Sequence, residues 1–303
     1  MIYTLTLNPS VDYIMELATF HKGGLNRSKV ESAFPGGKGI NVSRVLHVLN
    51  VESVALGFAG GYTGEYIKQF LNNEGIQTDF VEVEEASRIN VKVKSDDETE
   101  INGSGPAIRE EHIEQLLKKI SFLGAEDMIV LAGSIPHSVP KSFYQEIASQ
   151  CQKQGTKVII DAEKNLIQPV LSLHPFLIKP NHHELGEMFD VEIGSIEDAV
   201  HYGRKLKESG TENVMVSMAE KGAILLTGDE VLYSSVPKGE LRSSVGAGDS
   251  TVAGFLAGLS RGWDIRDAFR LGTSAGSATA YSIGLCSSKK VESLFEEIQI
   301  AIK

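Results

Sequence analysis

The feature that most restricts the fold of this chain is the alternation of short apolar runs with helical patterns. Amphipathic patterns occupy residues 39–50, 63–75 and 141–154. Six apolar runs around them are typical of buried strands, at residues 2–7, 53–60, 128–133, 157–162, 176–180 and 213–218. Strands that alternate with helices favour a mostly parallel sheet flanked by helices. We therefore predict an α/β fold. Because no repeat, low-complexity tract or linker interrupts the chain, we expect a single domain over residues 1–303.

Some segments do not follow this alternation of strands and helices. Residues 88–103 alternate between apolar and polar positions, and the sequence "SDDE" within them suits a hairpin connection. Residues 12–17 and 26–34 also have strand-like sequences without helices to connect them. We predict that these pieces form a small β-sheet lid, built from about 12–34 and 88–103 and inserted in the main domain.

The predicted lid has one apolar face, which carries Ile89, Val91 and Val93. Nothing in its own chain is expected to cover this face, and the edges of the sheet are open. A second copy of the chain would cover both. The lid therefore predicts a homodimer.

Composition and charge exclude several classes of protein. No segment approaches the roughly 18 unbroken apolar residues of a membrane span, so we expect no membrane partner. The chain starts directly in strand-like sequence, without the features of a secretory signal. Cys151 and Cys286 form no disulfide framework or metal-binding spacing, which suits a reducing cytoplasm. The formal net charge of −11 argues against binding to nucleic acid.

The stretch "GAGDS" predicts an anion-binding turn. Gly246, Ala247 and Gly248 form a tight turn that opens a helix near Asp249. Backbone N–H groups in such a turn, with the positive end of a helix dipole, bind anions. Asp249 should repel a phosphate placed there. Either it serves only as a helix-start residue, or it moves a proton beside the phosphate.

The stretch "PGGKGIN" is a second glycine-rich turn, over residues 35–41. It is not a Walker loop, because Ser32 stands where that motif needs its first glycine and Gly39 where it needs Ser or Thr. It also lacks the glycine pattern of a dinucleotide site. Lys38 and Asn41 lie near the mouth of the turn. The segment is either a ligand-binding turn or a plain strand-to-helix turn.

Three further stretches allow both a functional and a structural interpretation. Asp12 follows the first strand, where a carboxylate can bind vicinal sugar hydroxyls or merely begin a turn. Asn181 and Glu184 suit either a hydrated Mg²⁺ or a capping box. Ser217 and Gly222 suit either a nucleotide edge or a β-turn.

Small residues crowd the helical pattern at 266–282, notably from Ala275 to Ala278. They would let either an adenine ring or another helix pack closely against this helix. His182 and His183 do not form a zinc motif, since they lack both the H-E-x-x-H spacing and cysteine partners.

Taken in order along the chain, these stretches resemble the PfkB-type (ribokinase-like) family of sugar kinases. The resemblance is carried by Asp12 after Pro-Ser, "PGGKGINVSRVL", Arg88 with Asn90, the Asn181 to Glu184 pair, and "GAGDS". Within the family, "TLTLNPSVDY" and "GLNRS" resemble the branch that phosphorylates sugar phosphates. The resemblance implies a ribokinase-like fold, with ATP and Mg²⁺ used at the site.

The family pattern also implies a role for each site residue. Asp249 would be the general base, and the amides of Gly246, Ala247 and Gly248 would form the anion hole. The sugar would be held by Asp12, Gly36, Gly37, Asn41 and Asn90. Its existing phosphate would be met by Arg27, Lys38, Arg88 and Ser134, with the three cations converging. ATP would be bound by Lys179, Asn181, Ser217, Gly222, Gly246, Gly248 and Ser277, and Glu184 would order Mg²⁺ through water.

Two alternatives remain open for the function. "INGSGP" and "NHHEL" favour fructose 1-phosphate as the substrate, and the first alternative is a kinase for tagatose 6-phosphate. The second alternative is a sugar-phosphate sensor that binds without turnover. A sensor would be expected to have lost Asp249 or Glu184, and both are present.

Overall fold

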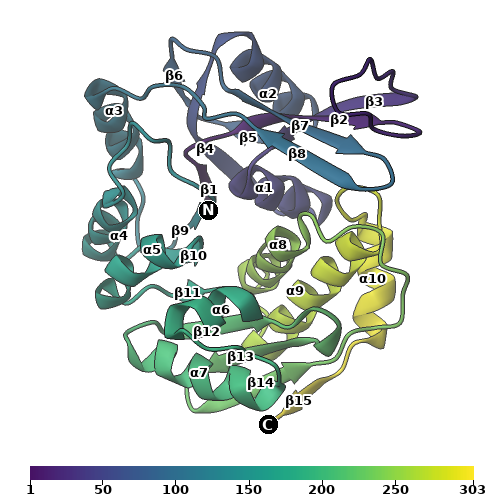
Figure 1. Cartoon of the computed structure of the whole chain (residues 1–303). Helices are drawn as coiled ribbons and strands as arrows, with labels where there is room; N and C mark the ends of the chain where they lie inside the picture. Colours follow the sequence, from purple (N-terminus) through teal and green to yellow (C-terminus); the bar gives the residue numbers. More distant parts are fainter.

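The computed structural model describes residues Met1–Lys303 and contains two β-sheets (Figure 1). The larger sheet consists of β1 (Ile2–Thr6), β4 (Ser53–Gly60), β5 (Gln77–Thr78), β6 (Val81–Val83), β9 (Met128–Ala132), β10 (Lys157–Asp161), β11 (Leu177–Ile178), β12 (Asn213–Ser217), β13 (Ala223–Thr227), β14 (Glu230–Ser234) and β15 (Ile300–Ile302). The strand order is β15-β14-β13-β12-β11-β10-β9-β1-β4-β5, and β6 pairs with β4. All pairs from β12 to β5 are parallel, whereas β13, β14 and β15 add an antiparallel edge.

Helices cover both faces of this sheet. One face carries α3 (Glu110–Ile120), α4 (Phe143–Gln154), α5 (Lys164–Ile167), α6 (His182–Phe189) and α7 (Ile196–Glu208). The other carries α1 (Lys38–Val48), α8 (Ala247–Ser260), α9 (Ile265–Ala280) and α10 (Ser288–Glu297). The remaining helices are α2 (Gly61–Asn73) and the short 3₁₀ helices η1 (Gln168–Leu173) and η2 (Ala219–Lys221). This arrangement is the mostly parallel α/β fold predicted from the alternation of strands and helices.

The hydrophobic cores lie on opposite faces of the main sheet, because successive side chains of a strand point in opposite directions. In β9, Ile129 and Leu131 pack with α4, whereas Val130 packs with α8. Phe143 of α4 and Phe255 of α8 are both fully buried in these cores. Helix α8 is buried over most of its length, so its first turn is held on a rigid element.

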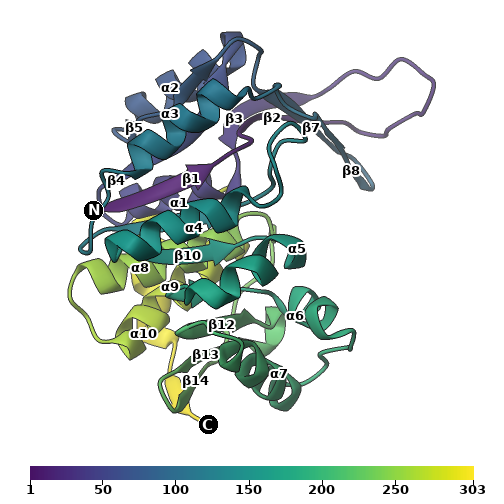
Figure 2. The ribbon, with the colours of Figure 1, turned by 90° about the vertical axis from the view of Figure 1, so that its left-hand side faces the viewer.

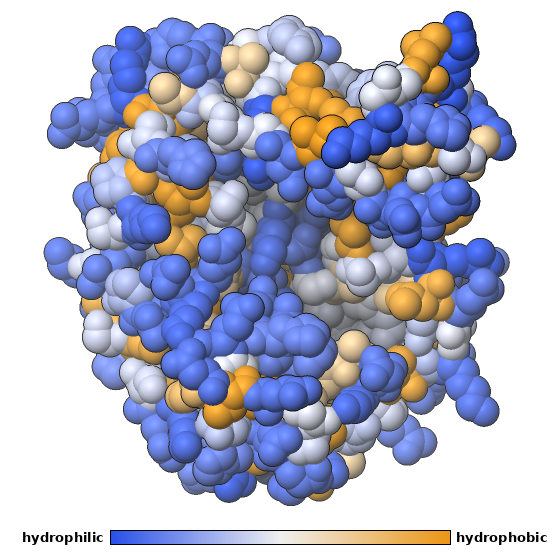
Figure 3. Space-filling view, in the orientation of Figure 1, coloured by the Kyte–Doolittle hydropathy of each residue, from blue (hydrophilic) through white to orange (hydrophobic).

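The smaller sheet is the predicted lid. Its strands are β3 (Val30–Gly36), β2 (Ser10–Glu16), β7 (Arg88–Lys94) and β8 (Glu98–Asn102), in that order. Strands β2 and β7 are parallel, and the other two pairs are antiparallel. The lid lies above the first turn of α8 (Figure 1). Figure 3 shows a hollow between the lid and the body.

Two expectations about the lid were wrong in part. The strand predicted at 26–34 begins only at Val30, because pairing with β2 ends at Glu16. The connection before it, which includes Arg27, projects away from the body (Figure 2). The apolar face is also partly covered by its own chain, since Val11 packs in a buried cluster with Ile67 of α2.

The outer part of that face remains exposed. Ile89 is 37% exposed and Ile101 is 61% exposed. Figure 3 shows apolar atoms gathered over β7 and β8. None of the helices in the structure is both long and apolar enough to cross a membrane.

Candidate active site

The first turn of α8 contains the predicted base. Gly246 precedes the helix with φ of 78°, a left-handed conformation that favours glycine. Asp249 follows in the first turn and is only 6% exposed. The first N–H groups of a helix lack intrahelical acceptors and carry partial positive charge. Ala247 N already donates to Ser244 O at 3.3 Å, which leaves the amide of Gly248 better placed for a ligand.

Asp249 is held by a side chain from the opposite end of the sequence. Asn41 Nδ2, in the first turn of α1, donates a 2.8 Å hydrogen bond to Asp249 Oδ2. Burial and then the negative charge of Asp161 raise the pKa of Asp249 to about 6, although the Asn41 hydrogen bond opposes this shift. A carboxylate with a pKa near neutrality suits proton transfer at physiological pH.

A buried carboxylate beside this turn, Asp161, was not predicted from the sequence. Its Oδ1 is 2.7 Å from Lys38 Nζ, and its Oδ2 is 3.1 Å from Lys179 Nζ. Burial alone would raise the pKa of Asp161, but the charges of Lys179 and Lys38 outweigh it and lower that pKa. Burial likewise disfavours the charged form of Lys38, but Asp161 outweighs burial and raises the pKa of Lys38. Asp161 therefore stabilises the charged form of Lys38 and also forms an ion pair with Lys179.

The cluster lies next to the glycine turn. A Cβ atom placed on Gly248 would be 3.1 Å from Lys179 Nζ and 4.0 Å from Asp161 Oδ2. Asp161 ends β10, and the carboxyl ends of parallel strands are where such folds bind ligands. That strand-end position is the signal by which the sequence would have revealed it.

Among the residues predicted to bind ATP, the structure contains the capping box of Asn181 and Glu184. Glu184 N donates to Asn181 Oδ1 at 2.9 Å, and Asn181 N donates to Glu184 Oε2 at 2.8 Å. Asn181 also forms a parallel bridge with Ser217 at the end of β12. A Cβ atom on Gly222 would overlap the carbonyl oxygen of Ser234, so the close approach of β14 explains this glycine.

The small residues of α9 serve helix packing at one position. A Cβ atom at Gly276 would overlap Thr251 Oγ1 of α8. Ser277, the neighbouring candidate for ATP binding, is partly buried. The helix-packing interpretation therefore holds for Gly276.

The lid brings together the predicted sugar-binding residues. Asp12 Oδ1 accepts hydrogen bonds from Ser10 Oγ at 2.7 Å and from Asn90 Nδ2 at 3.1 Å. Gly36 lies directly against this carboxylate, and a side chain there would overlap Asp12 Oδ1. Gly37, which precedes α1, has φ of 119°. Two hydrogen bonds thus saturate Asp12 Oδ1, whereas Oδ2 accepts no hydrogen bond from the protein.

Arg88 is a half-buried cation without a carboxylate partner within 4 Å. Its Nε donates to Asn8 O at 3.0 Å, and its Nη1 lies 3.4 Å from Gly103 O. Burial lowers the pKa of Arg88, while the charge of Asp12 opposes that shift. Neutral carbonyls orient the guanidinium but leave its charge uncompensated. Such a group is suited to binding an anion.

A single chain does not bring Arg27, Lys38 and Arg88 together as expected. Lys38 pairs with Asp161 instead, on the side of the glycine turn. Arg27 is exposed on the connection between β2 and β3. Strand β2 spans about 20 Å between the two ends of the lid. Arg27 follows its outer end and Arg88 pairs with its inner end, so the two lie apart in one chain.

The residue before Ser134 lies near Lys38. This residue is Gly133, where a Cβ atom would be 3.9 Å from Lys38 Cβ. Gly133 N donates to Asp161 O at 3.1 Å. Of the residues predicted to bind the sugar's phosphate, Lys38 therefore lies beside Asp161, and Ser134 follows a glycine next to Lys38.

This fold and site define a carbohydrate kinase with a lid over its cleft. The pfkB family carbohydrate kinase model matches residues 5–291, and the chain belongs to this family. The 1-phosphofructokinase of Bacillus subtilis is 53% identical over 300 residues, covering 99% of each chain. The D-tagatose-1-phosphate kinase of Bacillus licheniformis is 37% identical over 301 residues, covering 99% of each chain.

A solved structure has the same fold. The tetrameric inhibited form of phosphofructokinase-2 from Escherichia coli matches with a TM-score of 0.91 and 28% sequence identity, covering 98% of each chain. These comparisons confirm the family and the ribokinase-like fold predicted from the sequence.

Proposed function

We propose that this chain transfers the γ-phosphoryl group of ATP to fructose 1-phosphate and forms fructose 1,6-bisphosphate. The observation that carries the proposal is Asp249, a buried carboxylate with a pKa of about 6 in the first turn of α8. The 53% identity to a protein named 1-phosphofructokinase favours fructose 1-phosphate as the substrate. Relatives named D-tagatose-1-phosphate kinase make tagatose 1-phosphate the main competing substrate, in place of the 6-phosphate considered from the sequence.

In the proposed reaction Asp249 takes the proton from the sugar's 6-hydroxyl. The hydroxyl oxygen then bonds to the γ-phosphorus while the bond between this phosphorus and the ADP oxygen breaks. The amides of Gly246, Ala247 and Gly248 would stabilise the charge on the transferred group. Lys38 and Lys179, held by Asp161, would add positive charge at the same place.

The metal proposal rests on the free carboxylate oxygen of Glu184. Its Oε2 accepts the Asn181 amide, whereas Oε1 has no protein donor. A carboxylate with one free oxygen fits the water shell of Mg²⁺, which usually keeps several waters when bound with phosphates. Bound Mg²⁺ would neutralise charge on the phosphates of ATP. The chain's own contribution would be Glu184, which orders that water shell.

The remaining proposed ligands divide between the two substrates. Lid residues would bind the sugar phosphate, through Asp12, Gly36, Gly37, Asn41, Asn90 and Arg88. ATP would lie along Lys179, Asn181, Ser217, Gly222 and Ser277, next to the glycine turn. Because Lys38 and Ser134 lie near Asp161, we propose that they serve the transferred phosphoryl group rather than the sugar's own phosphate.

We further propose a homodimer formed through the lid. The exposed Ile89 and Ile101 on the outer face support it, since paired lids would cover them. In such a dimer the exposed Arg27 of one chain would reach the cleft of the other chain, although it does not reach the cleft of its own. We propose a single kinase domain with the lid inserted, in a cytoplasmic protein, which suits the two buried free cysteines Cys151 and Cys286.

A coupled ADP-release assay tests the function. The substrates are fructose 1-phosphate, fructose 6-phosphate, tagatose 1-phosphate and tagatose 6-phosphate, each with ATP and Mg²⁺, and Asp249→Asn is the inactive control. We expect fructose 1-phosphate to have the highest kcat/KM. A higher value for either tagatose phosphate would overturn the substrate proposal. Binding without ADP release on any sugar phosphate would identify a sensor.

A further inference from the structure

Lys92 lies in the middle of the lid and has no role in the site described above. It belongs to β7, and its side chain is 12% exposed. Its ammonium group is 3.6 Å from Asp12 Oδ2 and 3.4 Å from Glu100 Oε1. These partners come from β2 and β8, on either side of β7. Lys92 therefore links three strands of the lid through one charge.

Neither contact of Lys92 is short enough for a hydrogen-bonded ion pair. Both distances exceed the roughly 2.7–2.9 Å of a charge-assisted hydrogen bond. Asp12 Oδ1 is saturated by Ser10 and Asn90, and it lies so close to Gly36 that a Cβ atom there would overlap it. Oδ2 has no hydrogen-bond donor in the protein, and Lys92 is the one cation within 4 Å of it. Asp12 thus keeps an oxygen free for a ligand, with a positive charge beside it.

We propose that Lys92 is a positioning residue that holds Asp12 ready to bind the sugar hydroxyls. Its charge offsets those of Asp12 and Glu100, which face the same side of the lid. Without Lys92 the Asp12 carboxylate loses the one cation within 4 Å of it and the restraint on Oδ2. The carboxylate would then bind hydroxyls less well, because part of the binding energy would be spent on reorienting it. The inference rests on the proposed role of Asp12 as a sugar ligand.

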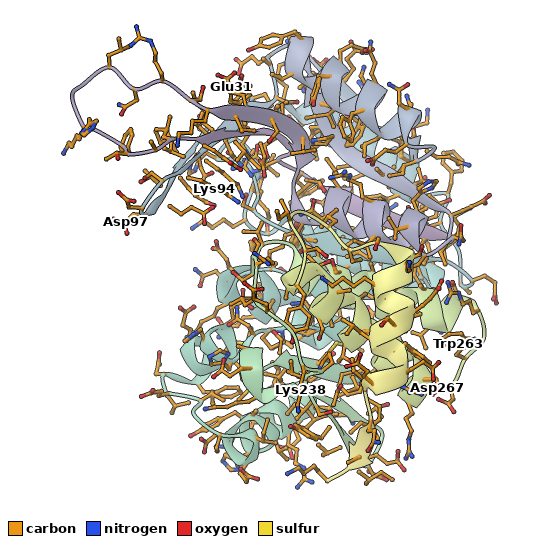
Figure 4. All side chains as sticks on the ribbon, turned by 90° about the vertical axis from the view of Figure 1, so that its right-hand side faces the viewer. Glu31, Lys94, Asp97, Lys238, Trp263 and Asp267 are labelled. Carbon is orange, nitrogen blue, oxygen red and sulfur yellow. The ribbon has the colours of Figure 1, made fainter.

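The chain offers a matched control in Lys94. It lies two residues further along β7, on the same face, and pairs in register with Glu16 and Glu98. It forms no ion pair within 4 Å. Figure 4 shows Lys94 towards the outer end of the lid, near the hairpin that carries Asp97. Removing either lysine changes the net charge equally, but only Lys92 neighbours Asp12.

The experiment compares Lys92→Met, Lys92→Arg and Lys94→Met in the full chain. For Lys92→Met we expect KM for fructose 1-phosphate to rise about tenfold, with kcat and KM for ATP within about threefold of wild type. Calorimetric titration of fructose 1-phosphate without ATP should show the same tenfold loss. Lys92→Arg should recover most of it, and Lys94→Met should stay within about twofold. Equal effects of Lys92→Met and Lys94→Met would overturn the proposal. Thermal unfolding of each variant checks that the lid remains folded.

A double variant separates this proposal from the function on which it rests. If Lys92 acts through Asp12, Lys92→Met should add less than about twofold to the KM of Asp12→Asn. A full tenfold addition would mean that Lys92 acts independently of Asp12, and the positioning role would be wrong. If Asp12→Asn leaves KM for the sugar phosphate unchanged, the proposed sugar site fails along with Lys92. If Asp12→Asn raises KM but Lys92→Met does not, the role of Lys92 alone fails.

Discussion

Asn41 and Asp249 are 208 residues apart in the sequence, yet their side chains form a 2.8 Å hydrogen bond between the first turns of α1 and α8. The bond joins the two glycine-rich turns of the chain. It also opposes the burial and the Asp161 charge that raise the pKa of Asp249 to about 6. The bond therefore both orients the proposed base and tunes the pH range in which it is ionised.

The pH dependence of catalysis should follow from these neighbours. We expect kcat/KM to fall below a pH of about 6, as Asp249 becomes protonated. Asn41→Ala removes a group that lowers this pKa, so the acid limb should move to higher pH. Asp161→Asn removes a charge that raises it, so the limb should move to lower pH. The sugar phosphate ionises identically in all three assays. A limb that stays in place would therefore belong to the substrate and not to Asp249.

Replacing Asp249 by Asn should reduce turnover but increase stability. We expect kcat to fall by about 10²–10⁴, with ATP and sugar-phosphate binding within about tenfold of wild type. Because the pKa of Asp249 is raised in the folded state, ionisation costs stability as the pH rises from about 4 to about 6. Melting curves at pH 4 and pH 7 should show that the free energy of unfolding of Asp249→Asn, relative to wild type, is about 1–3 kcal/mol higher at pH 7 than at pH 4. If the variant keeps more than a tenth of wild-type kcat, Asp249 is not the base and serves only as a helix-start residue.

Glu184→Gln should raise the Mg²⁺ requirement without unfolding the start of α6. The amide oxygen of Gln can still accept the hydrogen bond from Asn181 N, so the cap is kept. Half-saturation by Mg²⁺ should rise several-fold, while KM for the sugar phosphate changes little. The control is Asn181→Ala, which breaks the capping box and should cost about 1 kcal/mol in unfolding free energy. An unchanged Mg²⁺ titration for Glu184→Gln would assign Glu184 to the cap alone.

Arg88→Ala should distinguish a phosphorylated sugar from a free one. Arg88 carries an uncompensated charge that the sugar's phosphate would neutralise on lid closure. We expect a loss of about 2–5 kcal/mol in kcat/KM on fructose 1-phosphate, and a much smaller loss on free fructose. The measurement is the ratio of the two kcat/KM values. Equal losses would show that Arg88 serves only the lid, through its bonds to the Asn8 and Gly103 carbonyls.

The proposed dimer predicts a change of mass when the exposed lid face is charged. Ile101→Glu places a carboxylate on the outer face of β8, where Ile101 is 61% exposed. We expect light scattering after size exclusion to shift from dimer to monomer mass. The matched control is Ile302→Glu on the far edge strand β15, where the isoleucine is 59% exposed. If both variants keep the mass of the wild-type protein, the lid does not form the subunit interface.

Local patterns predicted most of the fold. The six apolar runs match β1, β4, β9, β10, β11 and β12, and the helical patterns match α1, α2 and α4, all within a few residues. Burial on both faces makes such strands continuously apolar, so a short window is enough to recognise them. The antiparallel edge of β14 and β15 was missed, because strand pairing depends on residues distant in sequence.

Residues close together in the sequence are enough to specify the turn at Gly246, the helix that starts beside Asp249, and the capping box of Asn181 and Glu184, because each depends on residues within one helical turn. Packing of the whole chain, in contrast, sets which charged side chains meet. It pairs Lys38 with Asp161 and leaves Arg27 on a projecting connection. The physical reason is that a buried charge must find a partner among groups brought near by packing of the whole sheet, and no local pattern encodes that neighbour.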